Sequence, residues 1–153
     1  NLRHLEWTEI DFSKKVIDIS SDKMKTSMDF LIPISTQVIE ILNDIKPYSF
    51  EKSKYVFPSP VSNNKPISEN TLNHALKRLG YKNIMTSHGF RSMFSTICND
   101  NISEHNINYE FIEKALAHQE KDQIREVYNR AKNIKELKKL MQWYSDYLTT
   151  LIM

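Results

Sequence analysis

The spacing of apolar residues changes once along this chain, and this change constrains the fold more than any other feature. Two short segments near the start, Val16–Ile19 and Phe30–Ile34, are rich in apolar residues and are typical of strands. A polar turn separates them, so we expect a hairpin. Pro33 lacks a backbone donor, which favours an edge position for the second strand. The pattern therefore predicts one small antiparallel sheet.

After residue 35 the apolar residues recur three and four positions apart, which is the period of an amphipathic helix. Ser35 can cap a helix that stops before Pro47, and Ser68 can cap a second helix that ends at Gly80. Residues Asn1–Trp7 are typical of the last turns of a helix. Further helices are expected at 87–98, 109–117, 121–129 and 134–151. The predicted fold class is α+β, mainly α, with a small antiparallel sheet packed beside a helical core.

Composition narrows the class of protein. The chain is 40% hydrophobic and 26% charged, which is ordinary for a globular domain in water. No apolar run reaches the roughly 20 residues of a membrane span, and the single cysteine, Cys98, excludes an internal disulfide and fits a reducing compartment. A net charge of +2 does not by itself indicate nucleic acid. Basic residues gather at 77–82, 121–130 and 132–139, either as solvated helix faces or as a contact surface.

His88 and Arg91 stand at the predicted start of a helix and share one face because they are three residues apart. That face meets the positive end of the helix dipole. Two donors placed there can hold a phosphate, the arginine through its planar guanidinium. On its own, however, His-x-x-Arg is also explained by ordinary structure. The apolar stripe of this helix is expected at Phe90, Met93 or Phe94, and Ile97.

Two further residues suit the same chemistry. His118 closes a Leu-Ala-His sequence thirty residues after His88, and Tyr128 follows ten residues later. A neutral tyrosine is a poor nucleophile because its pKa is near 10. Cationic or hydrogen-bonding neighbours would favour the phenolate and make it reactive. The alternative is that Tyr128 only adds to the apolar face of a short helix.

Taken in order, a hairpin lysine, His-x-x-Arg, Leu-Ala-His and a tyrosine resemble the signature of the tyrosine recombinases, the phage integrase family. The resemblance spans nearly the whole chain and concerns the C-terminal catalytic domain. Several other segments resemble the prophage and genomic-island branch: Trp7–Asp11, Lys23–Thr26 with Ile32–Ile34, Tyr55–Pro60, Ser68–Asn73 and Met141–Trp143.

The resemblance implies a site-specific DNA recombinase that integrates or excises a mobile element. Tyr128 would attack the scissile phosphodiester and form a 3′-phosphotyrosyl intermediate. Arg91 and His88 would hold the non-bridging oxygens, and His118 would add a further donor. The covalent link conserves bond energy, so no ATP, metal or other cofactor is expected. The histidines and the cysteine also show no metal-ligand spacing.

The resemblance also implies a general acid in the hairpin. Lys25, eight residues before Pro33, would protonate the departing 5′-oxygen, and Lys23 is the rival for this role. Both lysines are equally compatible with an exposed polar turn. Ser27 stands where the family often has glycine, which leaves the geometry of this turn open.

The family's first catalytic arginine belongs to an Arg-x-x-Glu-Leu pattern, and Asn1-Leu2 falls on its Glu-Leu pair. We therefore expect residues 1–153 to be a catalytic domain that lacks its N-terminal part, including that arginine, and the upstream DNA-binding domains. Such a fragment should cleave poorly on its own, since one charge clamp is missing.

The expected partners are double-stranded DNA at attachment sites, further copies of the protein in a tetramer, and DNA-bending or excision accessory proteins. No membrane is expected, and the location would be the bacterial cytoplasm. A stripe near the C-terminus either packs on the chain's own core or contacts a neighbouring copy. Its members are Ile134, Leu137, Met141, Tyr144, Leu148 and Leu151, and it is widened by Leu140, Trp143 and Tyr147. The alternative function is a non-catalytic DNA-binding relic or regulator.

Overall fold

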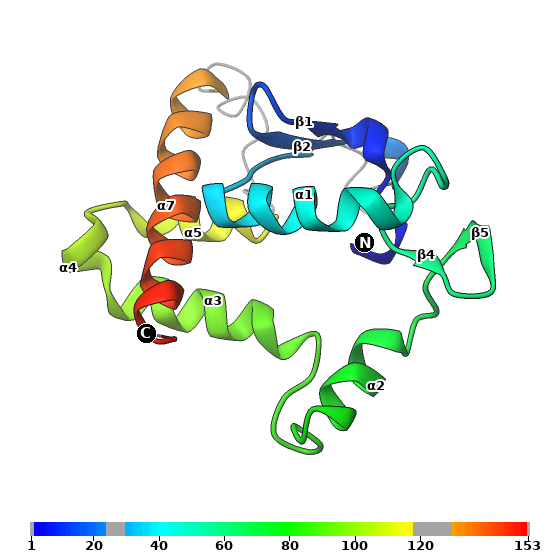
Figure 1. The fold of residues 1–153 in the computed structure, drawn as a ribbon. Helices are drawn as coiled ribbons and strands as arrows, with labels where there is room; N and C mark the ends of the chain where they lie inside the picture. Colours follow the sequence, from blue (N-terminus) through cyan, green and yellow to red (C-terminus); the bar gives the residue numbers. More distant parts are fainter. Residues whose placement is uncertain (1, 24–29, 118–129, 153) are drawn as a thin grey trace.

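The structure, a computed structural model, describes residues 2–23, 30–117 and 130–152, and the side chains of all of these except 130–132. Most of the described chain is helical (Figure 1). The helices are α1 (Thr36–Ser49), α2 (Thr71–Arg78), α3 (Gly89–Asp100), α4 (Ile102–His105), α5 (Tyr109–Ala115) and α7 (Arg130–Thr150). The 3-10 turns are η1 (Leu2–His4), η2 (Trp7–Glu9) and η3 (Ser21–Lys23). The predicted mainly helical α+β class is confirmed, whereas the helix expected at 121–129 lies outside the described residues.

A three-stranded antiparallel sheet forms near the N-terminus, in the order β1 (Ile10–Asp11), β2 (Val16–Ile19), β3 (Phe30–Pro33). The expected hairpin is confirmed, because β2 and β3 pair with Val16 opposite Pro33. Pro33 also lies on an edge strand, as its missing N–H requires. A second, two-stranded sheet joins β4 (Pro58–Ser59) to β5 (Ser62–Pro66).

The first residues do not continue a helix, and this expectation was wrong. Glu6 is extended and forms a β-bridge with Tyr55, which separates the turns η1 and η2. The Trp7 N–H donates to the Lys54 carbonyl, and the Val56 N–H donates to the Leu5 carbonyl. The Trp7 N–H and the Leu5 carbonyl thus bond to residues 54–56 and are not available for hydrogen bonds within a helix.

Helix α1 begins as predicted but runs past its proline. The Ser35 hydroxyl accepts a hydrogen bond from the Val38 N–H, so the cap is confirmed. Pro47 lies inside the helix rather than after it, and near the C-terminal end it removes only its own hydrogen bond. The last turn is held by Ser49, whose buried hydroxyl donates to the Val56 carbonyl and accepts from the indole N–H of Trp7.

Helix α2 begins later than expected. Asn70 is at the N-cap position and makes no side-chain cap, while the Ser68 hydroxyl shares a hydrogen bond with that of Thr71. A turn closed by the Thr71 N–H on the Ser68 carbonyl delays the start of the helix. The predicted stop is confirmed, because Gly80 has a φ of +92°, a left-handed conformation that suits glycine.

Two groups of buried apolar residues hold the fold. The first unites the N-terminal turns, the sheet and α1: Leu5, Trp7, Ile10, Ile34, Leu42 and Val56. The second, which we call the helical cluster, unites α3, α5 and α7 with the loop before α5: Phe94, Cys98, Ile107, Ile112, Leu116 and Leu140. In Figure 1 helix α7 lies beside α5, and the two are in contact.

Helix α7 is joined to the start of α1 by a polar junction. The Gln142 side chain accepts a hydrogen bond from the Thr36 N–H and donates to the Thr36 hydroxyl, and the Ser145 hydroxyl donates to that of Ser35. Within the C-terminal stripe, Leu137 and Leu140 are buried, and Met141, Trp143 and Tyr144 pack against the helical cluster, whereas Leu151 is exposed. Among the described residues, no helix combines the length and apolar character that crossing a membrane would need.

Candidate active site

The loop before α3 is fixed to α2 by side chains that accept backbone hydrogen bonds. The Asn73 amide oxygen accepts from the Ser87 N–H at 2.8 Å, and the Thr86 hydroxyl accepts from the Gly89 N–H at 3.1 Å. Thr86 thus closes the turn that leads into α3, while His88 occupies the N-cap position without a side-chain cap. These contacts hold His88 at the very start of the helix, with helical backbone angles.

Arg91 lies on the inward stripe of α3, which corrects the predicted stripe. Phe94 and Cys98 are buried, while Phe90, expected in the core, is 46% exposed. Arg91, Phe94 and Cys98 are spaced three and four residues apart, so they share one helix face. His88 precedes Arg91 by three residues and continues this face to the helix start. Burial raises the pKa of the Cys98 thiol to about 12, so this group is an unsuitable nucleophile.

The guanidinium of Arg91 reaches across to the end of α5. It donates a hydrogen bond to the Leu116 carbonyl, which is partly buried. Ala117, the next residue, has a φ of 52°, a left-handed conformation that an alanine adopts only at a cost. A left-handed residue directly after the C-cap is a common way for a helix to end, so this conformation terminates α5. The structure therefore brings the His-x-x-Arg sequence and the Leu-Ala of the second motif together.

The other site residues predicted from sequence are not all described. His88 is exposed at the start of α3, and its ring makes no hydrogen bond within the part of the chain that the structure describes. His118, Tyr128 and Lys25 lie outside the described residues, so their predicted roles stay predictions. No group of three potential metal-ligating side chains converges among residues 2–23, 30–117 and 130–152.

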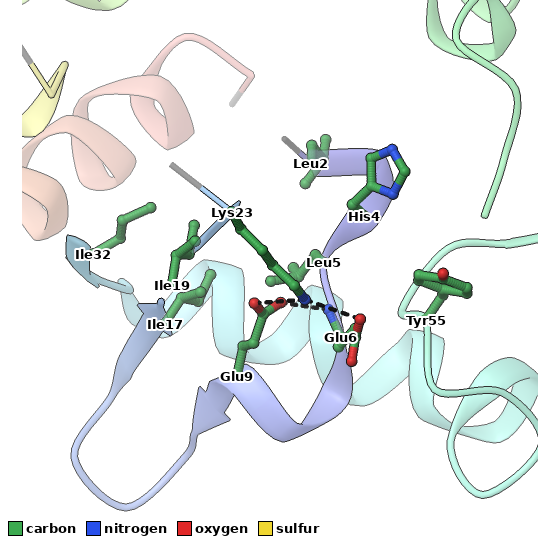
Figure 2. A pocket seen from close by; sticks show the side chains of 10 residues that line it. All are labelled: Leu2, His4, Leu5, Glu6, Glu9, Ile17, Ile19, Lys23, Ile32 and Tyr55. Carbon is green, nitrogen blue, oxygen red and sulfur yellow. Dashed lines mark hydrogen bonds and ion pairs between the residues drawn. The ribbon is translucent and has the colours of Figure 1, made fainter. Parts of the chain in front are cut away.

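The rival lysine, Lys23, has a different environment. Its ammonium nitrogen lies 2.9 Å from a carboxylate oxygen of Glu6 and 3.0 Å from one of Glu9. Figure 2 shows the three side chains meeting at the rim of a largely apolar pocket of about 520 Å³. Lys54 also reaches Glu6, at 3.2 Å. Lys23 therefore bridges two carboxylates.

The charges of this group stabilise one another. Hydrogen bonds from Lys23 and Lys54 hold the pKa of Glu6 below its ordinary value. Partial burial of Lys23 opposes its ionisation, but its bonds to Glu6 and Glu9 outweigh burial and raise the pKa of its ammonium. Lys23 is thus held in its charged form and is slow to give up a proton near neutral pH.

Sequence reasoning missed three of these features. Thr86 closes the turn before α3, a place where threonine hydroxyls often accept backbone hydrogen bonds, so it could have been found. The bridge from Lys23 to Glu6 and Glu9 joins residues 17 and 14 positions apart, and no local pattern reveals such a contact. The contact of Arg91 with the Leu116 carbonyl could not be predicted either, because every residue has a backbone carbonyl.

Comparisons with known proteins identify relatives over almost the whole chain. The sequence model of the phage integrase family matches residues 1–135. The integrase of Shigella phage Sf6 is 35% identical over 147 residues, covering 96% of this chain and 37% of the relative. The prophage integrase IntA of Escherichia coli K12 is 37% identical over 140 residues, covering 92% and 33%. The prophage integrase IntS of the same strain is 35% identical over 147 residues, covering 96% and 37%.

The chain therefore spans about a third of the length of these curated relatives. No solved structure matches it significantly.

Proposed function

Because the chain belongs to the phage integrase family, we propose that it carries the strand-cleaving site of a site-specific DNA recombinase. The observation that supports this most directly is the hydrogen bond from the Arg91 guanidinium to the Leu116 carbonyl. It joins the helix that begins with His88 to the residues that immediately precede His118. Arg91 lies on α3 with His88 at its N-cap position, and His118 follows Ala117 directly in the sequence, so we propose these three side chains as the donors to one phosphate.

The proposed reaction needs only residues of this kind and DNA. The phenolate oxygen of Tyr128 attacks the scissile phosphorus, and the bond from phosphorus to the 5′-oxygen breaks. Arg91, His88 and His118 stabilise the negative charge that develops on the non-bridging oxygens. The product is a 3′-phosphotyrosyl link and a free 5′-hydroxyl. Attack by the 5′-hydroxyl of another strand reverses the step and releases the tyrosine, so neither energy source nor metal is consumed.

Lys25 is proposed as the general acid that delivers a proton to the departing 5′-oxygen. The surroundings of Lys23 support this choice over the rival. A general acid must lie within hydrogen-bond reach of the atom it protonates, whereas the Lys23 ammonium is already shared by Glu6 and Glu9. Leaving that pair of carboxylates to reach DNA would cost Lys23 both of its ion pairs.

Double-stranded DNA is the proposed partner. The cluster Lys77, Arg78 and Lys82 is exposed on α2 and the loop that follows it, where it is available to phosphates. Assembly into a tetramer and contacts with DNA-bending or excision proteins are proposed on the family relationship alone.

The proposal is tested by trapping the covalent intermediate. The full-length natural protein is incubated with attachment-site DNA that carries a nick beside the scissile phosphate, so that the cleaved fragment diffuses away. We expect a protein–DNA adduct that survives denaturing electrophoresis and is absent from Tyr128→Phe. The matched control is Tyr48→Phe, because Tyr48 on α1 is 80% exposed and belongs to no proposed site. It should retain the adduct.

The same assay separates the second candidate function. A non-catalytic DNA-binding relic would retard the DNA in a native gel and form no adduct with any variant. An adduct that persists in Tyr128→Phe would remove Tyr128 from the mechanism.

A further inference from the structure

The charged group formed by Lys23, Glu6 and Glu9 has no part in the mechanism above, although it adjoins the proposed general acid. We propose that Lys23 is a positioning residue, whose bridge to the two carboxylates fixes the base of the hairpin from which Lys25 extends. This inference rests on the proposed function, since it deepens the role given to Lys25.

The geometry supports a structural anchor. Lys23 ends η3, the turn that follows β2, while Glu6 and Glu9 belong to the N-terminal turns η1–η2 and their junction. The Glu9 carboxylate also accepts the Glu6 N–H at 2.7 Å, so the two acceptors are themselves held together. One ammonium thus ties the turn η3, which follows β2, to two carboxylates that are linked to each other through the Glu6 N–H.

The surroundings make this bridge stronger than an ordinary surface ion pair. The three side chains are only 32%, 19% and 11% exposed for Lys23, Glu6 and Glu9 respectively. The three side chains border a pocket whose other walls are mostly apolar: Leu2, Leu5, Ile17, Ile19 and Ile32 (Figure 2). Reduced contact with water strengthens such pairs.

Lys23 and Lys25 are close in the sequence, so loss of the bridge should affect mainly the step assigned to Lys25. Lys25 follows Lys23 by only two residues, and a change at Lys23 should act on that step first. A proton donor displaced by about 1 Å can slow a reaction by about 100-fold. Loss of the bridge should therefore slow the step that needs the proton more than any other step.

The experiment uses a leaving group that needs no proton. In a 5′-bridging phosphorothiolate substrate, sulfur replaces the departing 5′-oxygen, and the thiolate leaves with its electron pair unprotonated. We compare cleavage of this substrate and of the normal phosphodiester by the full-length natural protein. Lys23→Met keeps the aliphatic stem and removes the charge. We expect it to cleave the phosphodiester about 10- to 100-fold more slowly and the phosphorothiolate at the unmodified rate.

Three further variants make the result specific. Lys25→Met should show the same pattern with a larger loss on the phosphodiester. Lys23→Arg can still bridge two carboxylates and should cleave both substrates near the unmodified rate. Lys14→Met is the matched control, because Lys14 also pairs with a carboxylate, that of Asp11 at 2.9 Å, but is 77% exposed. It should change neither rate.

Equal slowing of both substrates by Lys23→Met, or no slowing of either, would overturn the inference. If Lys23→Met does not fold, Glu6→Gln tests the same bridge with one carboxylate kept, and the same two outcomes decide. Failure of the proposed function is visible separately, because the unmodified protein would then form no adduct at all.

Discussion

Leu140 on α7 is 0% exposed and lies in the helical cluster with side chains of α3 and α5. Leu140→Ala removes three carbon atoms, which costs about 2.4 kcal/mol at about 0.8 kcal/mol per buried methylene group. Helices α3, α5 and α7 surround the space that the substitution leaves, so their side chains fill it only partly. The remaining cavity adds about 1 kcal/mol to the loss. We therefore expect the free energy of unfolding to fall by about 3 kcal/mol.

Urea denaturation followed by circular dichroism measures this loss, and thermal unfolding provides a second reading. For a domain of this size, about 3 kcal/mol corresponds to a fall in Tm of about 10 °C. The matched control is Leu151→Ala near the end of the same stripe, where the side chain is 65% exposed. That change should alter the unfolding free energy by less than about 0.5 kcal/mol.

The comparison also separates the two interpretations of the C-terminal stripe. Packing on the chain's own core requires Leu140→Ala to be far more destabilising than Leu151→Ala. A loss below about 1 kcal/mol at Leu140, or similar losses at both positions, would refute the placement of α7 against α3 and α5.

Two further predictions concern the backbone before His118 and the charged group at the hairpin. Ala117→Gly should raise the unfolding free energy by about 0.5 kcal/mol. Glycine avoids the roughly 1–2 kcal/mol cost of the left-handed conformation, but it loses more entropy on folding. A lower unfolding free energy in urea denaturation would contradict the positive φ of Ala117. The pKa of Glu6 is lowered from its ordinary value of 4.5, so its stabilisation is complete above that pH and is lost as the pH falls through the lower folded value. In Glu6→Gln the decline of unfolding free energy below pH 4.5 should therefore be shallower, and an unchanged slope in acid denaturation would count against the bridge to Lys23.

The elements with a strong local period could be predicted from the sequence. Val16–Ile19 and the strand after it pair as expected because their apolar residues need a common face. The described helices after residue 35 follow from the three- and four-residue spacing, except the single turn α4, which was not predicted. The strand Ile10–Asp11 was missed because two residues carry no period.

The misassigned face of α3 shows why local patterns are insufficient. Two stripes fit its sequence, one through Phe90 and one through Arg91, and hydrophobicity favours Phe90. The fold takes the other, because the Leu116 carbonyl supplies a partner for the buried side of the Arg91 guanidinium. A polar group is tolerated inside when its hydrogen bonds are satisfied, and that partner is 25 residues away.

The residues expected to act together were found by their order in the chain, which reflects ancestry rather than local physics. His88 and Arg91 could be placed at a helix start from sequence, and the structure agrees. The contact between α3 and the end of α5 depends on packing of Phe94, Ile112 and Leu116, which no spacing rule specifies.

The polar junction between α7 and α1 has a practical consequence for measurements in salt. Gln142 and Ser145 contribute amide and hydroxyl groups to it, and its described contacts include no ion pair. Added electrolyte weakens contacts with phosphates steeply but hardly affects hydrogen bonds between neutral groups. If DNA binds as proposed, a rise in ionic strength should release it while α1 and α7 stay joined, so that dissociation and unfolding are observed as separate events.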